Sequence, residues 1–209
     1  MAVDALMDSG LPREVLLKCA LAGEAVAAGA SHPDNAAPSL LGGLVLVPAW
    51  EPLRIIELEV PRELTAVHVH PHLEIETAGA REVLGRTVTL EDAIAQWGNT
   101  AALVAGLFRS DWDLISRAVV DHIAEPLRSP AVPGFPEVRR AGLDAGALAV
   151  SLSGSGPSLF ALCRGQASGR AVGEAMKAAF RSAADLAADV LVSPAQAPGA
   201  RLLEEGDSA

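Results

Sequence analysis

Three neighbouring polar side chains, His32, Asp34 and Asn35, have the chemistry to bind a small polar ligand. They lie in the stretch His-Pro-Asp-Asn-Ala-Ala-Pro-Ser-Leu-Leu-Gly-Gly, which ends at Gly43. Its prolines predict a loop over 32–43, and an apolar strand is expected to follow directly. Functional side chains often lie on a loop that is positioned by a neighbouring strand. The stretch predicts a site for hydroxyl and amino groups, and the alternative is an Asx turn that only caps the loop.

A carboxylate precedes this stretch. Glu24 lies late on an amphipathic helix predicted from Glu14 to Ala28. A carboxylate there could hold Mg²⁺, which takes oxygen ligands and keeps waters beside phosphate oxygens. Spacing alone favours the other interpretation, in which Glu24 faces solvent at the end of its helix.

A glycine-rich turn separates two apolar strands predicted at 147–152 and 158–163. Glycines let a backbone approach a ligand closely and can point successive N–H groups into one concavity. An ordinary β-turn explains the residue types slightly better. The candidate phosphate and active-site loop consists of Ser153, Gly154, Ser155 and Gly156.

Two arginines are candidates for gripping an anion. Arg81 lies in a helix predicted over 77–84, and Arg128 follows the sequence Ile-Ala-Glu-Pro-Leu. The guanidinium fork matches carboxylates and phosphates at two points. For either arginine taken alone, surface charge is the better interpretation.

Three alternating histidines are candidates for a zinc site. His68, His70 and His72 would share one face of a strand, and imidazoles are zinc ligands. Pro71 interrupts the strand before the third histidine, and the sequence offers no fourth ligand. Zinc is therefore the weaker interpretation.

Composition narrows the functional class. The 209 residues have a formal net charge of −10, which argues against a nucleic-acid surface. The longest apolar stretch, residues 36–50, is shorter than the roughly 20 residues that a membrane span requires. Cys19 and Cys163 are expected to be buried, reduced thiols, which indicates a reducing compartment and a cytoplasmic protein.

Strands and helices follow one another without strict alternation, which predicts an α+β fold. A glycine-turned hairpin beneath helices fits the second half of the chain. The further elements expected are strands at 54–60, 64–69 and 201–203, and helices at 90–108, 137–142 and 170–189.

Taken together and in order, these motifs resemble the homoserine kinases of the GHMP small-molecule kinase superfamily. The resemblance runs over nearly the whole chain. The segments that carry it are Gly23-Glu24, residues 32–43, Thr77 to Arg81, residues 123–128, Pro133-Gly134-Phe135, residues 151–162 and Gly199-Ala200-Arg201.

The resemblance implies a two-layer GHMP kinase fold and ATP-dependent phosphorylation of the L-homoserine hydroxyl, a step of threonine biosynthesis. It implies that Glu24 binds Mg²⁺, that His32, Asp34 and Asn35 hold homoserine, and that Asp34 is the base or orients the hydroxyl. Arg81 and Arg128 would grip the substrate carboxylate in the same cradle as Asp34. A homodimer is compatible with the resemblance.

The sequence departs from the family pattern in one respect. Family members have a Gly-Ser-rich phosphate loop at a helix N-terminus, which holds the triphosphate, in a segment before the region that matches residue 1. We therefore expect residues 1–58 to be the remainder of the ATP-binding domain and 59–209 to be a ferredoxin-like C-terminal domain. Kinase activity of this chain alone is expected to be impaired. The alternatives are another GHMP small-molecule kinase and a non-catalytic amino-acid-binding fragment.

Overall fold

The chain forms two units. The computed structural model describes residues 1–28, 33–50, 52–74, 83–85 and 87–203. One unit comprises Met1–Glu59 and the segment from Gln196 onward, and the other comprises Val60–Ala195. The sequence-based division instead places the C-terminal segment in the second domain. Each unit is described by itself below.

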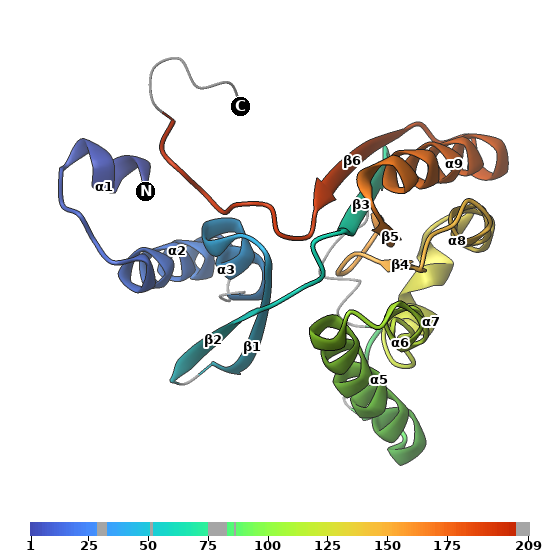
Figure 1. The fold of residues 1–209 in the computed structure, drawn as a ribbon, viewed down its shortest axis with the longest axis horizontal. Helices are drawn as coiled ribbons and strands as arrows, with labels where there is room; N and C mark the ends of the chain where they lie inside the picture. Colours follow the sequence, from blue (N-terminus) through green and yellow to red (C-terminus); the bar gives the residue numbers. More distant parts are fainter. Residues whose placement is uncertain (29–32, 51, 75–82, 86, 204–209) are drawn as a thin grey trace. The chain divides into compact units, whose positions relative to one another are not determined.

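The first unit is a small helical layer with a hairpin. A compact core of Leu17, Ala37 and Leu40 joins its second and third helices, and partly buried Val45 and Ile55 of the hairpin pack against that core. Its elements, drawn in blue to teal in Figure 1, are α1 (Ala2–Leu6), α2 (Arg13–Ala28), α3 (Pro33–Leu41) and the antiparallel strands β1 (Leu44–Trp50) and β2 (Leu53–Leu58).

The expected loop over 32–43 is wrong, because residues 33–41 form helix α3. Pro33 begins the helix, where a missing N–H costs no hydrogen bond. Pro38 removes only the bond to the carbonyl four residues earlier, and the Ser39 hydroxyl donates to the Asn35 carbonyl at 2.9 Å. Prolines confined to the first two turns are thus compatible with a helix, and Asp34 and Asn35 stand in its first turn.

Two glycines let the C-terminal segment cross the end of α3. Gly43 N–H donates to the Ala197 carbonyl, and Ala200 N–H donates to the Ser39 carbonyl, each at 2.9 Å. A Cβ on Gly42 would overlap the Gly199 backbone, and a Cβ on Gly199 would overlap the end of α3. The close backbone crossing therefore requires glycine at both positions.

The second unit is built on a four-stranded antiparallel sheet in the order β4-β5-β3-β6. Strand β3 lies at the centre, with Val67 opposite both Ala161 and Val192. Strands β5 and β6 both run antiparallel to β3 and are joined by α9, which makes a split β-α-β unit. The expected ferredoxin-like sheet is confirmed. The strands are β3 (Leu64–Pro71), β4 (Ala149–Leu152), β5 (Leu159–Arg164) and β6 (Ala188–Pro194).

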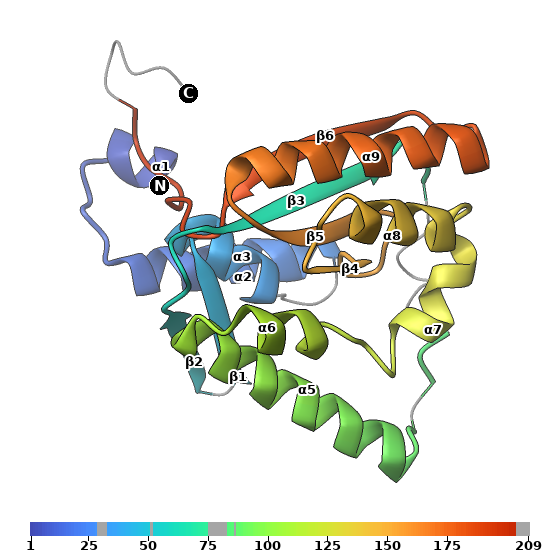
Figure 2. The same cartoon turned by 45° about the vertical axis from the view of Figure 1, so that its right-hand side comes forward.

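Helices α8 and α9 cover one face of this sheet, as Figure 2 shows. Inward residues alternate along β3, so Val67 and Val69 are fully buried in a core that also contains Met176 and Phe180 of α9. The helices of the unit are α5 (Leu90–Arg109), α6 (Trp112–Ala118), α7 (Glu125–Arg128), the short 3₁₀ helix η1 (Ser129–Ala131), α8 (Phe135–Asp144) and α9 (Gln166–Ala184).

Three further expectations need correction. The helix predicted over 170–189 ends at Ala184, because Asp185 adopts a left-handed conformation (φ 55°) and the chain then enters β6. Residues 201–203 form no strand. Cys19 is exposed, whereas Cys163 is buried. Most of the helix expected over 77–84 lies outside the described residues. In the part of the chain that the structure describes, no helix combines the length and apolarity needed to cross a membrane.

A substitution at Gly173 tests the contact between α9 and the sheet. A Cβ at this position would lie 2.5 Å from Val190 Cγ1 and 3.2 Å from Val67 Cγ1. Gly173→Ala should therefore lower the free energy of unfolding by about 1–3 kcal/mol, despite the higher helix propensity of alanine. Glu174→Ala, at the exposed neighbouring position, should stay within about 0.5 kcal/mol of wild type. Urea unfolding measures both, and equal stability of the two variants would contradict this packing.

Candidate functional site

The glycine-rich turn joins β4 to β5 and is the hairpin that the sequence predicted. Ser153 N–H donates to the Ser158 carbonyl at 2.8 Å, and Gly156 N–H donates to the Ser153 carbonyl at 3.1 Å. Gly154 and Gly156 have φ values of +60° and +77°, a region that favours glycine. The turn thus presents an exposed backbone at Gly154.

Arg128 reaches this turn from helix α7. Its Nη1 donates to the Gly154 carbonyl at 3.1 Å, across 26 residues of sequence. Sequence reasoning singled out Arg128 and Gly154 separately, and the structure brings them together. The guanidinium is large enough to bind a carbonyl with one edge and an anion with another.

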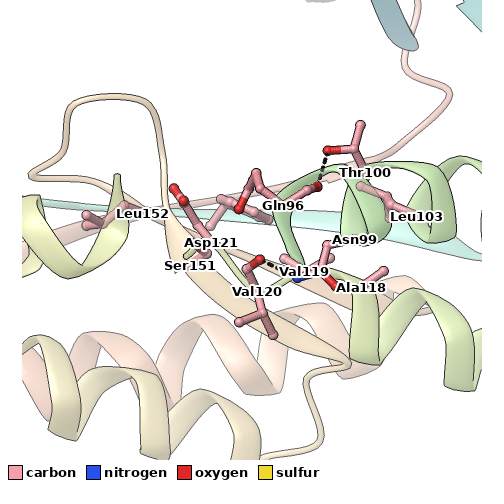
Figure 3. Close-up of a pocket in the computed structure, with 11 residues that line it drawn as sticks. Gln96, Asn99, Thr100, Leu103, Ala118, Val119, Val120, Asp121, Ser151 and Leu152 are labelled. Carbon is pink, nitrogen blue, oxygen red and sulfur yellow. Dashed lines mark hydrogen bonds between the residues drawn. The ribbon is translucent and has the colours of Figure 1, made fainter. Parts of the chain in front are cut away.

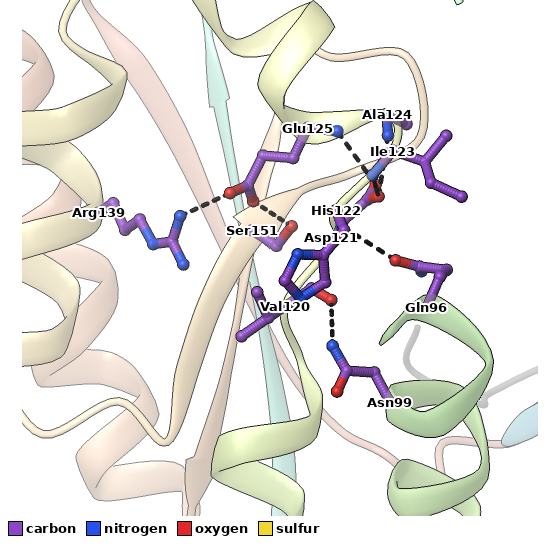
Figure 4. Close-up of polar contacts among 10 residues, drawn as sticks. All are labelled: Gln96, Asn99, Val120, Asp121, His122, Ile123, Ala124, Glu125, Arg139 and Ser151. Carbon is purple, nitrogen blue, oxygen red and sulfur yellow. Dashed lines mark hydrogen bonds and ion pairs between the residues drawn. The ribbon is translucent and has the colours of Figure 1, made fainter. Parts of the chain in front are cut away.

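Helix α7 is held in place by a buried carboxylate that sequence reasoning missed. Glu125 is 6% exposed. Its Oε1 accepts from Arg139 of α8, and its Oε2 accepts from the Ser151 hydroxyl of β4, each at 2.5 Å. Figure 4 shows the carboxylate between these two partners. The Glu125 carboxylate therefore joins α7 to α8 by an ion pair and to the sheet by a hydrogen bond, three residues before Arg128.

Asp121 caps the start of α7. Its Oδ1 accepts from the N–H groups of Ile123 and Ala124 at 2.8 Å, and its Oδ2 accepts from Glu125 N–H at 3.1 Å (Figure 4). An aspartate at this place satisfies N–H groups that have no partner within the helix. The sequence signal was available: an acidic residue a few positions before Pro126 is typical of a helix start.

An open hollow of about 230 Å³ lies beside this network. Figure 3 shows Gln96 and Asn99 of α5 on one side of it and Ser151 and Leu152 of β4 on the other. Gln96 Oε1 accepts from His122 N–H at 3.0 Å, and Asn99 Nδ2 donates to the Val120 carbonyl at 2.8 Å. The hollow is lined by polar and apolar groups alike, and none of the site residues predicted from the sequence lines it.

The remaining predicted residues that the structure describes belong to the first unit. Asp34 and Asn35 are exposed neighbours in the first turn of α3, and Glu24 is half-buried near the end of α2. An exposed carboxylate and amide side by side can bind hydroxyl or ammonium groups. His32 and Arg81 lie outside the described residues. The convergence of Asp34, Arg81 and Arg128 on one cradle stays a prediction.

Two of the three alternating histidines, His70 and His72, have protein partners. His70 Nδ1 lies 2.8 Å from the Ser158 hydroxyl, and His72 Nε2 lies 3.0 Å from Asp189 Oδ2. Within the described ranges, no group of three or more His, Cys, Asp or Glu side chains is placed to hold a metal ion. Burial of His68, with a smaller effect of neighbouring His70, lowers the pKa of His68 below 6.5.

Three comparisons relate this geometry to known proteins. A family model described as GHMP kinases C terminal matches residues 103–182, which include Arg128 and the glycine-rich turn. Homoserine kinase from Chlorobaculum tepidum is 48% identical over 77% of this chain and 50% of its own length. Homoserine kinase from Xylella fastidiosa is 41% identical over 97% of this chain and 62% of its own length.

Solved structures also relate this chain to a homoserine kinase. The crystal structure of homoserine kinase from Cytophaga hutchinsonii has a TM-score of 0.88 and 46% identity, over 91% of this chain and 60% of that one. Residues 103–182 of the chain are a GHMP kinase C-terminal domain. L. major mevalonate kinase, at 16% identity and a TM-score of 0.68 over 94% of this chain, shares the fold. The chain spans half to about three fifths of the length of the homoserine kinases named here.

The ion pair of Glu125 should be critical for stability. Arg139→Met keeps much of the apolar stem but leaves a buried carboxylate without its cation, so the free energy of unfolding should fall by about 3 kcal/mol. Arg117→Met removes the exposed pair with Asp113 and should cost less than about 0.5 kcal/mol. Chemical denaturation distinguishes the two, and a tolerated Arg139→Met would contradict the anchoring role of Glu125.

The lowered pKa of His68 predicts a loss of stability in mild acid. As pH falls below 6.5, the unfolded chain binds a proton that folded His68 does not yet bind, so stability falls until the lowered folded pKa is reached. Between about pH 7 and pH 5, wild type should therefore lose more stability than His68→Gln. His122→Gln, at an exposed position, is the control and should follow wild type. Equal losses in wild type and His68→Gln would rule out this contribution.

Proposed function

We propose that this chain is the part of a homoserine kinase that binds homoserine, and that the complete enzyme transfers the γ-phosphoryl group of ATP to the homoserine hydroxyl. The observation on which the proposal most depends is the hydrogen bond between Arg128 and Gly154. It joins the arginine proposed to grip the substrate carboxylate to the loop proposed to lie near the phosphates. Relatives named homoserine kinase, at 41–48% identity, support the choice of substrate.

The reaction needs positioning and charge neutralisation more than covalent chemistry. The hydroxyl oxygen of homoserine attacks the γ-phosphorus, the bond from that phosphorus to the bridging oxygen breaks, and ADP leaves. Asp34 takes the hydroxyl proton or orients the hydroxyl, with Asn35 and His32 beside it. Arg81 and Arg128 hold the carboxylate, and the product is O-phospho-L-homoserine.

Mg²⁺ would neutralise charge on the phosphates when it is bound. Glu24 offers a half-buried carboxylate oxygen, which is the ligand type that Mg²⁺ prefers. Mg²⁺ is commonly held by one or two carboxylates, together with waters and substrate phosphates. Glu24 as a single protein ligand from this part of the chain fits that pattern. We propose the cytoplasm as the compartment of the reaction.

Arg128 provides the test of this function. We would join this chain to the part of the Xylella fastidiosa homoserine kinase that lies outside the matched region, and measure ADP release with homoserine. Arg128→Met should raise the KM for homoserine at least about tenfold, because a charge-assisted hydrogen bond to the substrate carboxylate is lost. Arg117→Met, which removes an exposed arginine of α6, should leave KM unchanged.

A substrate panel separates the remaining alternatives. Homoserine, mevalonate and galactose are offered to the same joined protein, and a preference for mevalonate or sugar would replace the proposal by another GHMP kinase activity. Calorimetry on the 209-residue chain then asks whether homoserine binds without turnover. Binding by a joined protein that never releases ADP would identify an amino-acid-binding fragment instead of a kinase.

A further inference from the structure

His70 of β3 contacts the base of the glycine-rich turn. The backbone ladder between β3 and β5 has Val69 opposite Leu159 as its last pair on this side. One step further in the same antiparallel register, His70 comes opposite Ser158. Side chains make the contact there, with His70 Nδ1 2.8 Å from the Ser158 hydroxyl oxygen. This bond therefore extends the attachment of β5 to the central strand as far as the base of the turn.

The Ser158 hydroxyl depends on a protein partner. Ser158 is 9% exposed, so its hydroxyl has little access to water. His70 reaches it from an exposed position on the central strand. Either ring tautomer can form the bond, because the hydroxyl can donate to an unprotonated Nδ1 or accept from an Nδ1–H. Changing His70 therefore leaves a buried hydroxyl unpaired, whereas changing Ser158 leaves only an imidazole that water can reach.

Ser158 also takes part in closing the turn. Its carbonyl accepts from Ser153 N–H at 2.8 Å, and the Ser153 carbonyl accepts from Gly156 N–H at 3.1 Å. A displacement of Ser158 would therefore disturb both bonds that close the turn. At Gly154 the turn is held by Arg128, which donates to the carbonyl of that residue. The glycine-rich turn thus has two side-chain attachments, one from α7 and one from β3.

The neighbouring histidine makes a different contact. His72 follows β3, and its Nε2 lies 3.0 Å from Asp189 Oδ2 of β6. Both side chains of that pair are more than half exposed. Asp189 is opposite His70 in the register of β3 and β6, but its carboxylate is bonded to His72. His70 thus bonds toward β5 and the turn, whereas His72 bonds toward β6, which makes His72 a matched control.

We propose that His70 is a positioning residue for phosphoryl transfer, because its bond to Ser158 holds the base of the glycine-rich turn. The inference rests on the proposed function, in which this turn lies near the phosphates. A turn attached at two points has less freedom to lose in the transition state, where small displacements of the reacting groups are costly. The bond from His70 should therefore act on kcat, whereas Arg128, which grips the carboxylate, should act on the KM for homoserine.

Two substitutions remove the bond in the joined protein that tests the proposed function. Ser158→Ala removes the hydroxyl, and His70→Leu removes Nδ1. Each should lower kcat about tenfold and leave the KM for homoserine within about twofold of wild type. The double variant should lose no more than the larger single loss, because both changes remove the same bond. Full kcat in both single variants, or losses that multiply in the double variant, would overturn the inference.

A conservative variant and the matched control distinguish this bond from a general effect on the strand. His70→Asn places an amide oxygen or nitrogen at the position of Nδ1 and should return kcat to within about threefold of wild type. His72→Leu removes the bond to Asp189 and should leave kcat unchanged. A His70→Asn variant as slow as His70→Leu, or an equally slow His72→Leu variant, would assign the loss to the strand as a whole and overturn the inference.

Hydrogen exchange tests the attachment in the 209-residue chain, without turnover. In Ser158→Ala and His70→Leu, the N–H groups of Ser153 and Gly156 should exchange at least about fivefold faster than in wild type. The N–H group of Val67, in the paired centre of β3, should keep its wild-type rate and so show an intact sheet.

The outcomes separate this inference from the proposed function. Unchanged exchange in the turn would overturn the attachment by His70. Faster exchange with full kcat in the joined protein would leave a structural contact only and would overturn the positioning role. A joined wild type that releases no ADP with homoserine would instead overturn the proposed function, and the positioning role with it.

Discussion

The buried carboxylate of Glu125 determines how the second unit is assembled around its candidate site. A charge removed from water is tolerated only when it is paired and hydrogen-bonded. Arg139 of α8 supplies the cation, and Ser151 of β4 supplies the remaining donor. Because all three groups must meet, α7 can occupy only one place relative to α8 and the sheet. Arg128 and its bond to Gly154 follow from that placement.

The face of the sheet that α9 covers depends on close packing of small residues. Gly169 and Gly173 lie on one side of α9, where added Cβ atoms would lie 3.0 Å or less from valine or threonine side chains of β3 or β6. The helix therefore approaches the strands more closely than a helix with larger residues could. The same packing fixes β5, β3 and β6 relative to α9, and so fixes the start of β5, where the glycine-rich turn ends.

Sequence reasoning succeeded where local chemistry and tertiary structure agree. The alternation of β3 and the glycine-turned hairpin after Leu152 were both readable, because their side-chain period and turn residues are local signals. It failed at α3, where prolines in the first two turns were taken as loop signals, and at β6, which a left-handed Asp185 separates from a helix of similar apolarity. At β6, pairing with β3 makes residues 188–194 a strand.

The site was predictable residue by residue but not as a network. Arg128 and Gly154 carry chemistry that a sequence displays, whereas Glu125 is only one residue of the motif before Arg128. Nothing in the sequence joins Glu125 to Arg139 or Ser151. Their roles depend on burial and on contacts between residues 14 and 26 positions apart. A charged residue is expected at the surface unless a partner is known, and the partner is what the sequence alone does not provide.

Helix α5 shows that the sequence alone also does not tell which apolar residues are buried. One face packs within the unit through Ala93, Gly106 and Leu107. The large apolar residues outside that face are exposed, namely Leu90, Ile94, Trp97 and Phe108. A helix that is apolar over most of its circumference is normally enclosed by protein. In the sequence, the two apolar sets overlap and read as one strongly amphipathic helix. Only the fold separates the set that closes the core from the set that stays exposed.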